Sequence, residues 1–589
     1  MAQARALTAT LLLAAALTGT ASARAEDGAA EAAKRFRDAF LAGGSITERL
    51  GSPGKVEKDA VALLPGGMVI EAGPFDQAMK RLLDPVEARM ALRERAMGEA
   101  GAAPAAVADI GKAVAGMEKE NADFAARIAA VEASYAEVYD AGYMESGEKV
   151  HRARKLAAVL IPLYRSLALR NAAVAARAPG ALARSKDPAR QQWVISGFAD
   201  GSPAVRAAAA GAAGLLGGGR DAALLAPLQK SLRDDAVPAV RAAALAALLR
   251  WNLALVKDDV VAALTDPAWE VRALAAAACA RGKVLEATDA LVRALEKEGG
   301  RLQKDIEAAL RALHGVGFEG DAALWRRWLE ENRASVEERT KAAAASPDRE
   351  RPLGPPQSWE APAAGGREGD GPAEDGKPRN PTSSFYGIDT TSRRVLFVVD
   401  ISKSMEEPAV ARPPTVTGGK DEFASPKGNS KIEVARWQLH RAVAALPKDA
   451  IFNIVVFSES YKSWQDAMVE ASPAAKAKAH AFVEGLKPNG VTNIADSLDE
   501  AFDLAGAGPL AVPPKGAKGG LAVDTVFLLS DGNPNRGRFS DLPALLEDAV
   551  ARARASRLVI HAVGIGEVAG SEFLKSLAAR TGGRYVGFK

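Results

Sequence analysis

A pattern that recurs three times between residues 190 and 335 sets the strongest constraint on how this chain can fold. The segments DGSPAVRAAAAGAAG, DDAVPAVRAAALAAL and DPAWEVRALAAAACA each combine an acidic turn, a Val-Arg pair and an alanine-rich run. The pairs are Val205–Arg206, Val240–Arg241 and Val271–Arg272, which are spaced 35 and 31 residues apart. Helix pairs repeated at such a period cannot bury their apolar faces alone, so we expect them to stack into a solenoid.

These DxxxxVRxxA units resemble the bacterial type of HEAT repeat, and we assign residues 186–340 to them. Small alanine side chains allow neighbouring helices to approach closely. Each arginine is expected to reach back to the aspartate of its own turn. Residues 319–333 are expected to cap the stack. The solenoid would serve either as a protein-binding surface or as a spacer.

Residues 26–185 are predicted to form a mostly helical region. From Ile110 to Val138 the apolar positions, with polar Asn121 among them, alternate in spacings of four and three, which is a coiled-coil seam. A turn near 142–147 leads to a second helix. A short turn between helices favours antiparallel neighbours, so we expect an intramolecular hairpin. Self-association of these helices into a dimerisation rod is the alternative.

A Pro-, Gly- and charge-rich stretch over residues 341–387 predicts a flexible linker. Residues 388–589 then alternate strand-like and helix-like runs. Continuous apolar strands between helices predict an α/β doubly wound, mostly parallel sheet covered on both faces. The strands are expected at 395–400, 451–457, 525–529, 558–563 and 584–588, and the helices at 430–446, 473–486, 493–505, 541–554 and 570–580.

Oxygen-bearing side chains cluster where these strands end. In VLFVVDISKSM, a buried strand runs into Asp400, Ser402 and Ser404, and alternation lets all three side chains reach one point. Asp531 follows the strand in FLLSDG, and Thr492 stands at the start of a helix in GVTNIADSL. Ligands of open parallel sheets bind beyond the carboxyl ends of the strands. Hard divalent cations prefer oxygen ligands, so these five residues are candidate metal ligands.

The residues DISKS, GVTN and SDG, in this strand order, resemble a von Willebrand factor type A (VWA) domain with a complete metal-ion-dependent adhesion site (MIDAS). The resemblance implies that Ser402 and Ser404 bind the metal directly, and Thr492 directly or through water. It implies that Asp400 and Asp531 act mostly through bound waters. The ion would be Mg²⁺, with Mn²⁺ and Ca²⁺ as alternatives, and its sixth position would accept a carboxylate from a partner protein.

Two features depart from the family pattern, although neither removes a ligand. Lys403 stands where the family often has glycine, and an insertion over residues 406–430 follows the motif. Lys403, Arg536 and Arg538 are expected near the ion, where they would attract an anionic partner. The alternative is an ordinary solvated set of charges. We expect the insertion to overhang the site and to select the partner or shield the metal.

The first 25 residues resemble a secretory signal, with Arg5, a short apolar run and Ala-x-Ala sites before residue 26. No later apolar run is long enough to span a membrane. We therefore expect an exported protein, periplasmic or secreted. The only cysteine, Cys279, precludes an intramolecular disulfide, and the net charge of +3 gives no sign of nucleic-acid binding.

These features together predict an exported binding protein that uses a MIDAS on a helical scaffold. The alternatives are a structural scaffold that binds through its repeats, and a metal-assisted hydrolase. We predict no catalytic residues, because there is no nucleophile elbow, phosphate-binding loop or evident general base. The histidines form no metal-binding motif along the chain; they are His151, His314, His440, His480 and His561.

Overall fold

The computed structural model describes residues 29–64, 72–103, 106–140, 148–185, 187–217, 221–318, 320–345, 352–353, 383–409, 425–506, 522–532, 542–566 and 571–588. The expected signal, most of the expected linker and the middle of the insertion lie outside these residues.

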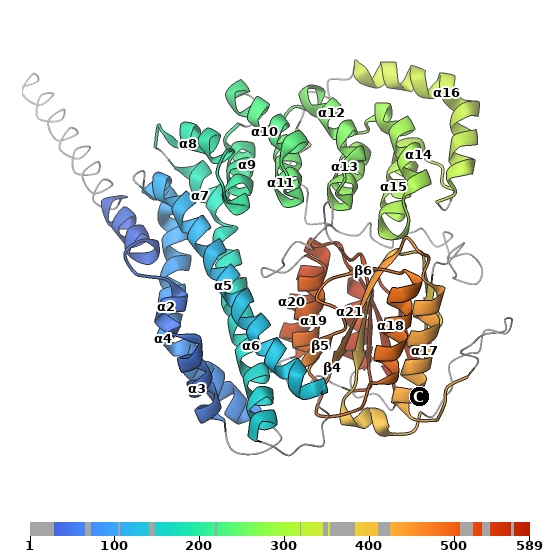
Figure 1. Ribbon diagram of the computed structural model, residues 1–589. Coiled ribbons are helices and arrows are strands. Elements are labelled where there is room, and N and C mark those ends of the chain that lie inside the picture. The colour runs from blue at the N-terminus through green and yellow to red at the C-terminus, as the bar shows by residue number, and fades with distance from the viewer. Residues whose placement is uncertain are drawn as a thin grey trace, which may run out of the picture.

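The N-terminal region is helical, as predicted, and contains a long antiparallel pair, α5 (Val107–Asp140) and α6 (Glu148–Ala175) (Figure 1). The rings of Phe124 on α5 and Tyr164 on α6 stack at 5.9 Å. Asn121 in the predicted seam donates to the Ala168 carbonyl of α6 at 3.4 Å. The seam therefore faces α6, which confirms the intramolecular hairpin. The other helices described in this region are residues 29–40, α2 (Ile46–Leu50), α3 (Pro53–Leu63), α4 (Ala72–Glu99) and α7 (Ala178–Arg184). The next helix, α8 (Arg190–Gly197), lies within the range assigned to the repeats.

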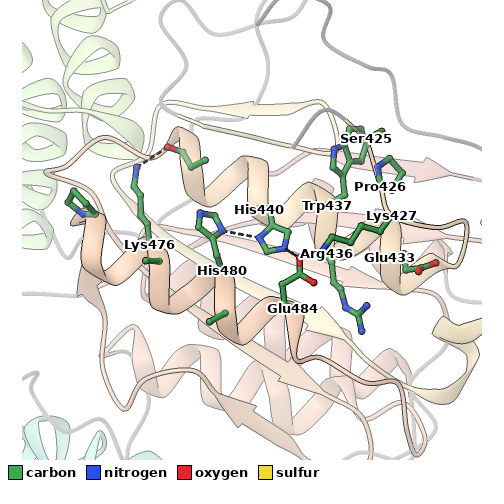
Figure 2. A pocket seen from close by; sticks show the side chains of 14 residues that line it. Ser425, Pro426, Lys427, Glu433, Arg436, Trp437, His440, Lys476, His480 and Glu484 are labelled. Atoms are coloured by element: carbon green, nitrogen blue, oxygen red, sulfur yellow. Dashed lines mark hydrogen bonds and ion pairs between the residues drawn. The ribbon is translucent and has the colours of Figure 1, made fainter. Parts of the chain in front are cut away.

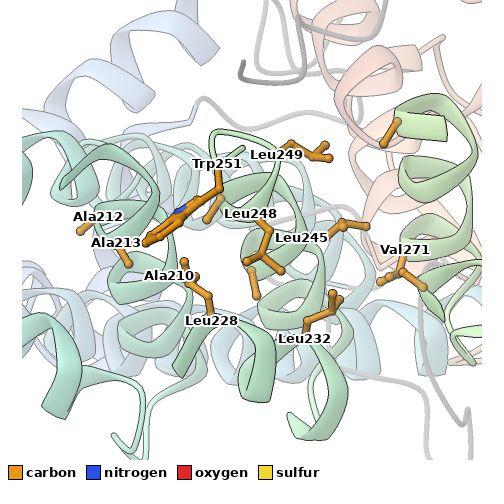
Figure 3. Packing of buried hydrophobic residues seen from close by; sticks show 14 of the residues in the cluster. Ala210, Ala212, Ala213, Leu228, Leu232, Leu245, Leu248, Leu249, Trp251 and Val271 are labelled. Atoms are coloured by element: carbon orange, nitrogen blue, oxygen red, sulfur yellow. The ribbon is translucent and has the colours of Figure 1, made fainter. Parts of the chain in front are cut away.

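The repeats form a row of stacked helices above the C-terminal sheet (Figure 1). Their helices are α9 (Pro203–Gly217), α10 (Ala222–Asp234), α11 (Pro238–Leu248), α12 (Leu253–Ala262), α13 (Trp269–Arg281), α14 (Thr288–Lys297), α15 (Gly300–His314) and α16 (Ala322–Ala344). Alanines such as Ala210 and Ala213 lie among buried Leu228, Leu248 and Trp251 between the helices (Figure 3). Small side chains on one helix thus leave room for large ones on the next, which is how the alanine-rich runs allow close stacking.

Each repeat arginine links two repeats instead of only closing its own turn. Arg241 donates to the backbone carbonyl of Asp235 in its own turn at 2.8 Å. Its Nε and Nη2 also donate to both oxygens of Asp266 in the following turn, at 2.8 and 2.7 Å. Arg206 makes the same bidentate pair with the Asp235 carboxylate. The arginine therefore contacts the aspartate of its own turn only through the backbone carbonyl of that aspartate. The carboxylate of the same aspartate pairs with the arginine of the preceding repeat.

The C-terminal region holds a mostly parallel sheet with the order β5-β4-β3-β7-β8-β9. The predicted strands are present, whereas the short antiparallel edge strands β5 and β6 and the β1–β2 hairpin were not predicted. β1 begins within the range expected as linker. The strands are β1 (Ser383–Phe385), β2 (Ile388–Thr390), β3 (Arg394–Asp400), β4 (Ile451–Phe457), β5 (Tyr461–Ser463), β6 (Val469–Glu470), β7 (Thr525–Ser530), β8 (Val559–Ile565) and β9 (Tyr585–Phe588).

Helices cover both faces of this sheet. Alternate residues of β3 enter different cores: Leu396 and Val398 join one hydrophobic cluster, and Phe397 and Val399 the other. Period-two alternation in a strand buried on both sides explains why its sequence is continuously apolar. The helices are α17 (Lys431–Ala445) and α18 (Pro473–Glu484) on one face, and α19 (Ile494–Leu504), α20 (Leu542–Ala555) and α21 (Ser571–Arg580) on the other.

The helical hairpin packs against the face of the sheet that α19, α20 and α21 cover. One hydrophobic cluster contains Leu160 and Leu167 of α6 together with Leu498 and Phe502 of α19. The solenoid lies next to the amino ends of the strands. A Cβ built on Gly299, which precedes α15, would be 3.4 Å from the carbonyl oxygen of Thr391, and Thr391 precedes β3. The carboxyl ends of the strands therefore face away from the repeats (Figure 1). Among the described helices, none is both long and apolar enough to cross a membrane.

Candidate metal centre

Parallel pairing of β3 with β4 and β7 brings the predicted site residues to one edge of the sheet. Val399 pairs with Leu529, so Asp400 and Ser530 end neighbouring strands and Asp531 follows directly. The loop after β3 is joined to the loop before α19 by two backbone bonds: Asn489 N–H donates to the Ile401 carbonyl at 2.7 Å, and Lys403 N–H to the Gly490 carbonyl at 3.2 Å. Three loops that are distant in sequence thus meet at one place.

The hydroxyls of the two serines converge on the Asp531 carboxylate. Ser404 Oγ donates to Asp531 Oδ1 at 2.8 Å, and Ser402 Oγ lies 3.5 Å from the same oxygen. The two hydroxyl oxygens are 3.1 Å apart. The side chain of Asp531 is fully buried, and Ser402 is 2% exposed, whereas Ser404 is partly exposed. One carboxylate and two hydroxyls therefore form a compact set of oxygens that solvent reaches from the side of Ser404.

Asp400 lies deeper than the other four candidate ligands. Its Oδ1 accepts from the Ser402 N–H at 2.7 Å, and its Oδ2 accepts from Ser530 Oγ at 2.6 Å. Burial raises the pKa of Asp400 to about 6, and the charge of Asp531 adds to the rise, while the bonds from Ser402 and Ser530 oppose it. Ser530 was not singled out from the sequence, where a serine before Asp-Gly reads as part of a turn. In the fold its hydroxyl orients the Asp400 carboxylate.

Thr492 enters the site on the loop before α19. The N-cap of that helix is Asn493, whose side chain accepts from the Asp496 N–H, so Thr492 is not the cap residue. Thr492 is 5% exposed. A Cβ built on Gly532 would lie 3.7 Å from Thr492 Oγ1, which places the threonine hydroxyl beside the Asp531–Gly532 turn.

Lys431, which sequence reasoning did not include, also belongs to the site. Its Nζ donates to Asp531 Oδ2 at 2.9 Å and to Glu407 Oε2 at 2.8 Å. Burial lowers the pKa of Lys431, but the bonds to Glu407 and Asp531 outweigh burial and raise that pKa. A capping box of Ser430 and Glu433 starts α17 at this lysine. The signal available in the sequence was a lone lysine after the insertion, which does not indicate a contact.

The insertion begins and ends beside the site. Pro408 and Ser430 form an isolated antiparallel bridge, and Ala409 N–H donates to the Asn429 carbonyl at 2.8 Å. The two ends are therefore held together next to Ser404 and Lys431. Of the predicted rim, Lys403 is exposed, whereas Arg536 and Arg538 lie outside the described residues.

The donor set fits a hard divalent cation. Two carboxylates and three hydroxyls are oxygen donors of the kind that Mg²⁺ takes, and an ammonium group already lies against one of the carboxylates as a stand-in positive charge. Among the described residues, no group of three His, Cys, Asp or Glu side chains could hold a metal ion. The candidate site contains only two acids, so hydroxyls would supply the remaining protein ligands.

A separate pocket between α17 and α18 contains the histidine pair that the sequence did not reveal (Figure 2). His440 Nδ1 lies 2.8 Å from His480 Nδ1, and His440 Nε2 lies 3.2 Å from Glu484 Oε1. Burial and the charge of His480 lower the pKa of His440. The two histidines are 40 positions apart on different helices, so no local motif indicates their contact. His561, in contrast, accepts from the Arg584 N–H at 2.9 Å within the sheet, as expected of a strand residue.

Comparisons with known proteins agree with this architecture. Residues 424–586 match the family model for the von Willebrand factor type A domain, and residues 159–249 match that for HEAT repeats. The first match begins after Ser404, so it includes Thr492 and Asp531 but not the Asp-x-Ser-x-Ser motif. HEAT-like repeats followed by a C-terminal VWA domain are therefore the supported arrangement of this chain.

Similar curated proteins match only part of this chain. Inter-alpha-trypsin inhibitor heavy chain H3 of Mesocricetus auratus is 25% identical over 198 residues, covering 33% of this chain and 19% of its own length. The von Willebrand factor A domain-containing protein 3A of Homo sapiens is 34% identical over 137 residues, 23% of this chain and 10% of its own. The chain thus spans at most about a fifth of these relatives.

A similar solved structure is a von Willebrand factor type A protein from Catenulispora acidiphila, with a TM-score of 0.25 and 22% sequence identity. The similarity covers 34% of this chain and 40% of that protein.

Proposed function

We propose that the VWA domain binds a divalent cation, Mg²⁺ with Mn²⁺ or Ca²⁺ as alternatives, and uses it to engage an acidic residue of a partner protein. The observation that carries the proposal is the convergence of Ser402, Ser404 and Asp531 within 2.8–3.5 Å of one another, from two loops at the carboxyl edge of the sheet. The VWA relatives support a protein-interaction role at the level of the domain.

Each residue has a distinct task in this proposal. Ser402 and Ser404 offer neutral hydroxyl oxygens, and Thr492 offers a third from the α19 loop. Asp531 provides charge within reach of the serines, whereas Asp400 provides charge from behind and holds the loop through the Ser402 N–H. A bound cation would supply an electrophilic position for a carboxylate oxygen of the partner. The VWA relatives support an interaction role, so we propose a binding protein and not an enzyme.

The solenoid and the hairpin would then act as a scaffold that leaves the site exposed to a partner. We propose the domain ranges 26–185, 186–340 and 388–589 for the hairpin region, repeats and VWA domain, with a signal over 1–25 and a linker over 341–387. A periplasmic or secreted location is a further part of this proposal, whereas self-association through the predicted seam is not, because that seam packs on α6.

Calorimetric titration of Mg²⁺ into the full chain tests the proposal. We expect saturable 1:1 binding by the wild type and loss of at least about tenfold in affinity for Asp531→Asn, because that change removes the one carboxylate shared by both serines. Asp466→Asn, an exposed acid in the β5–β6 turn, is the matched control and should bind as the wild type does. Equal heats for wild type and Asp531→Asn would contradict the proposed site.

Affinity capture of partner proteins in Mg²⁺ and in EDTA tests the second half of the proposal. Capture that requires Mg²⁺ and fails for Asp531→Asn supports metal-dependent engagement. Capture that survives both EDTA and Asp531→Asn would instead assign partner binding to the repeats. Exposed Leu215, Leu255 and Leu324, all on solenoid helices, are the observation that favours this second candidate.

A further inference from the structure

We propose that Lys431 is the resident cation of the candidate metal centre: its ammonium neutralises Asp531 in the metal-free protein and sets how tightly a divalent cation binds. This inference rests on the proposed metal-binding function. It assigns a role in that site to Lys431 and to Glu407, two residues outside the ligand set.

The ammonium group lies in a position that the fold has made for it. The Lys431 side chain is only 7% exposed, and its Nζ is 2.9 Å from Asp531 Oδ2. The other oxygen of Asp531 accepts from Ser404, so the carboxylate is shared between the hydroxyl set and the lysine. Gly566, with φ at +94°, follows β8, and a Cβ there would lie 3.1 Å from Lys431 Nζ. The glycine therefore leaves room for the ammonium.

The charges at this edge of the sheet explain why a resident cation is needed. Asp400 and Asp531 are two buried carboxylates that interact with each other. Two like charges in one buried site are unfavourable unless a positive group compensates them. Lys431 supplies that positive group inside the chain, so the site remains folded without a metal. The same charge repels an arriving divalent cation, which lowers the affinity of the site for that cation.

Glu407 offers the ammonium a second partner on the solvent side. Its carboxylate lies 2.8 Å from Lys431 Nζ and is 65% exposed. The flexible lysine side chain can thus move its charge from Asp531 towards Glu407 when a cation binds. Glu407 also lies at the start of the insertion, and Lys431 follows its end. Removing the glutamate charge should therefore weaken cation binding, whereas removing the lysine charge should strengthen it.

The test is calorimetric titration of Mg²⁺ into the full chain and three variants. Lys431→Met should bind Mg²⁺ at least about tenfold more tightly than the wild type. Glu407→Gln, a change at an exposed side chain, should bind it several-fold more weakly. Lys431→Arg keeps the positive charge and should therefore not reproduce the gain in affinity of Lys431→Met. If the wild type binds Mg²⁺ and Lys431→Met binds it no more tightly, the inference is overturned and the proposed function stands. Absence of binding in both proteins overturns both.

A second readout needs no metal and covers the case in which Lys431→Met folds poorly. In EDTA, Lys431→Met should lower the melting temperature, because it leaves Asp531 uncompensated. Asp531→Asn should cancel most of that loss in the double variant, since there is then no charge left to compensate. Additive effects of the two substitutions would show that the lysine does not neutralise Asp531, and would overturn the inference.

Discussion

At the scale of single residues, the two aspartates of the candidate metal centre differ in the groups that donate hydrogen bonds to them. Asp531 contacts two hydroxyls and an ammonium, whereas Asp400 contacts one backbone N–H and the Ser530 hydroxyl. Asp400 is therefore held by groups that need no metal. The loop after β3 is therefore positioned without a metal, which would lower the conformational cost of binding the proposed cation.

Ser530→Ala tests how much the hydrogen bond from Ser530 to Asp400 contributes to stability. The substitution removes a buried donor to a carboxylate, so we expect the free energy of unfolding to fall by about 1–3 kcal/mol. Ser497→Ala in α19 is a matched control, because Ser497 is equally buried and donates only to the Ile494 carbonyl. Its cost should be smaller. Chemical denaturation in EDTA measures both, and equal losses would argue against a special role for the bond to Asp400.

At the scale of elements, the repeat arginines explain why neighbouring helix pairs keep one register. The Arg241 and Asp266 side chains are only 6% and 7% exposed, and the pair is bidentate. A hydrophobic interface of alanines has little directional preference, whereas a bidentate pair allows one geometry. The apolar faces thus drive stacking, and the buried ion pairs specify how the units align.

Arg241→Ala should destabilise the stack, because it leaves Asp266 buried without its charged partner. We expect a loss of about 3–5 kcal/mol, measured as faster amide hydrogen exchange in α11 and α13. Arg327→Ala is the control, since its pair with Glu331 in α16 is exposed on both sides. That change should have little effect on stability, because solvent screens an exposed pair. Unchanged exchange in α11 would contradict the linking role.

At the scale of the whole molecule, a partly buried cluster of charges joins the hairpin to the VWA domain. Arg165 of α6 pairs with Glu500 and Asp503 of α19 at 2.7 and 2.9 Å, and Glu132 of α5 accepts from the Tyr461 hydroxyl of β5. Four carboxylates face two arginines here; they are Glu132, Asp499, Glu500 and Asp503, with Arg165 and Arg552. The excess of negative charge makes the interface sensitive to pH.

Docking of the hairpin should weaken as pH rises towards 8. Burial, with the charge of Glu500, raises the pKa of Glu132 from 4.5 to about 7, and burial raises that of Asp503 from 3.8 to about 7. A raised carboxyl pKa means that the folded state binds more protons, so its stabilising contribution is complete below about pH 4 and is lost as pH rises through about 7.

Glu132→Gln should therefore stabilise the protein at pH 8, by up to about 3 kcal/mol, and have little effect at pH 4. Chemical denaturation at the two pH values checks this. Glu137→Gln, at an exposed position further along α5, is the matched substitution of a carboxylate outside the cluster and should change stability little at either pH. A Glu132→Gln variant that loses stability equally at both pH values would contradict the assignment.

The sequence alone determined the two kinds of architecture and the candidate ligands. Repeat spacing, the coiled-coil spacing and continuous apolar runs are local properties, so they predicted the stacked helices, the hairpin and the parallel strands. Strand ends in a parallel sheet share one edge, which is why Asp400, Ser402, Ser404, Thr492 and Asp531 could be grouped from the sequence. The metal itself stays a prediction.

Only the tertiary structure decided which charges meet across the fold. Ser530 on Asp400, Lys431 on Asp531, the pairing of His440 with His480, and Arg165 of the hairpin on α19 all join positions that are distant in sequence. A lone lysine or arginine has no periodicity, and its partner depends on how helices and strands pack. Burial makes these contacts important for stability, because a charge removed from water is unfavourable unless a partner lies close by.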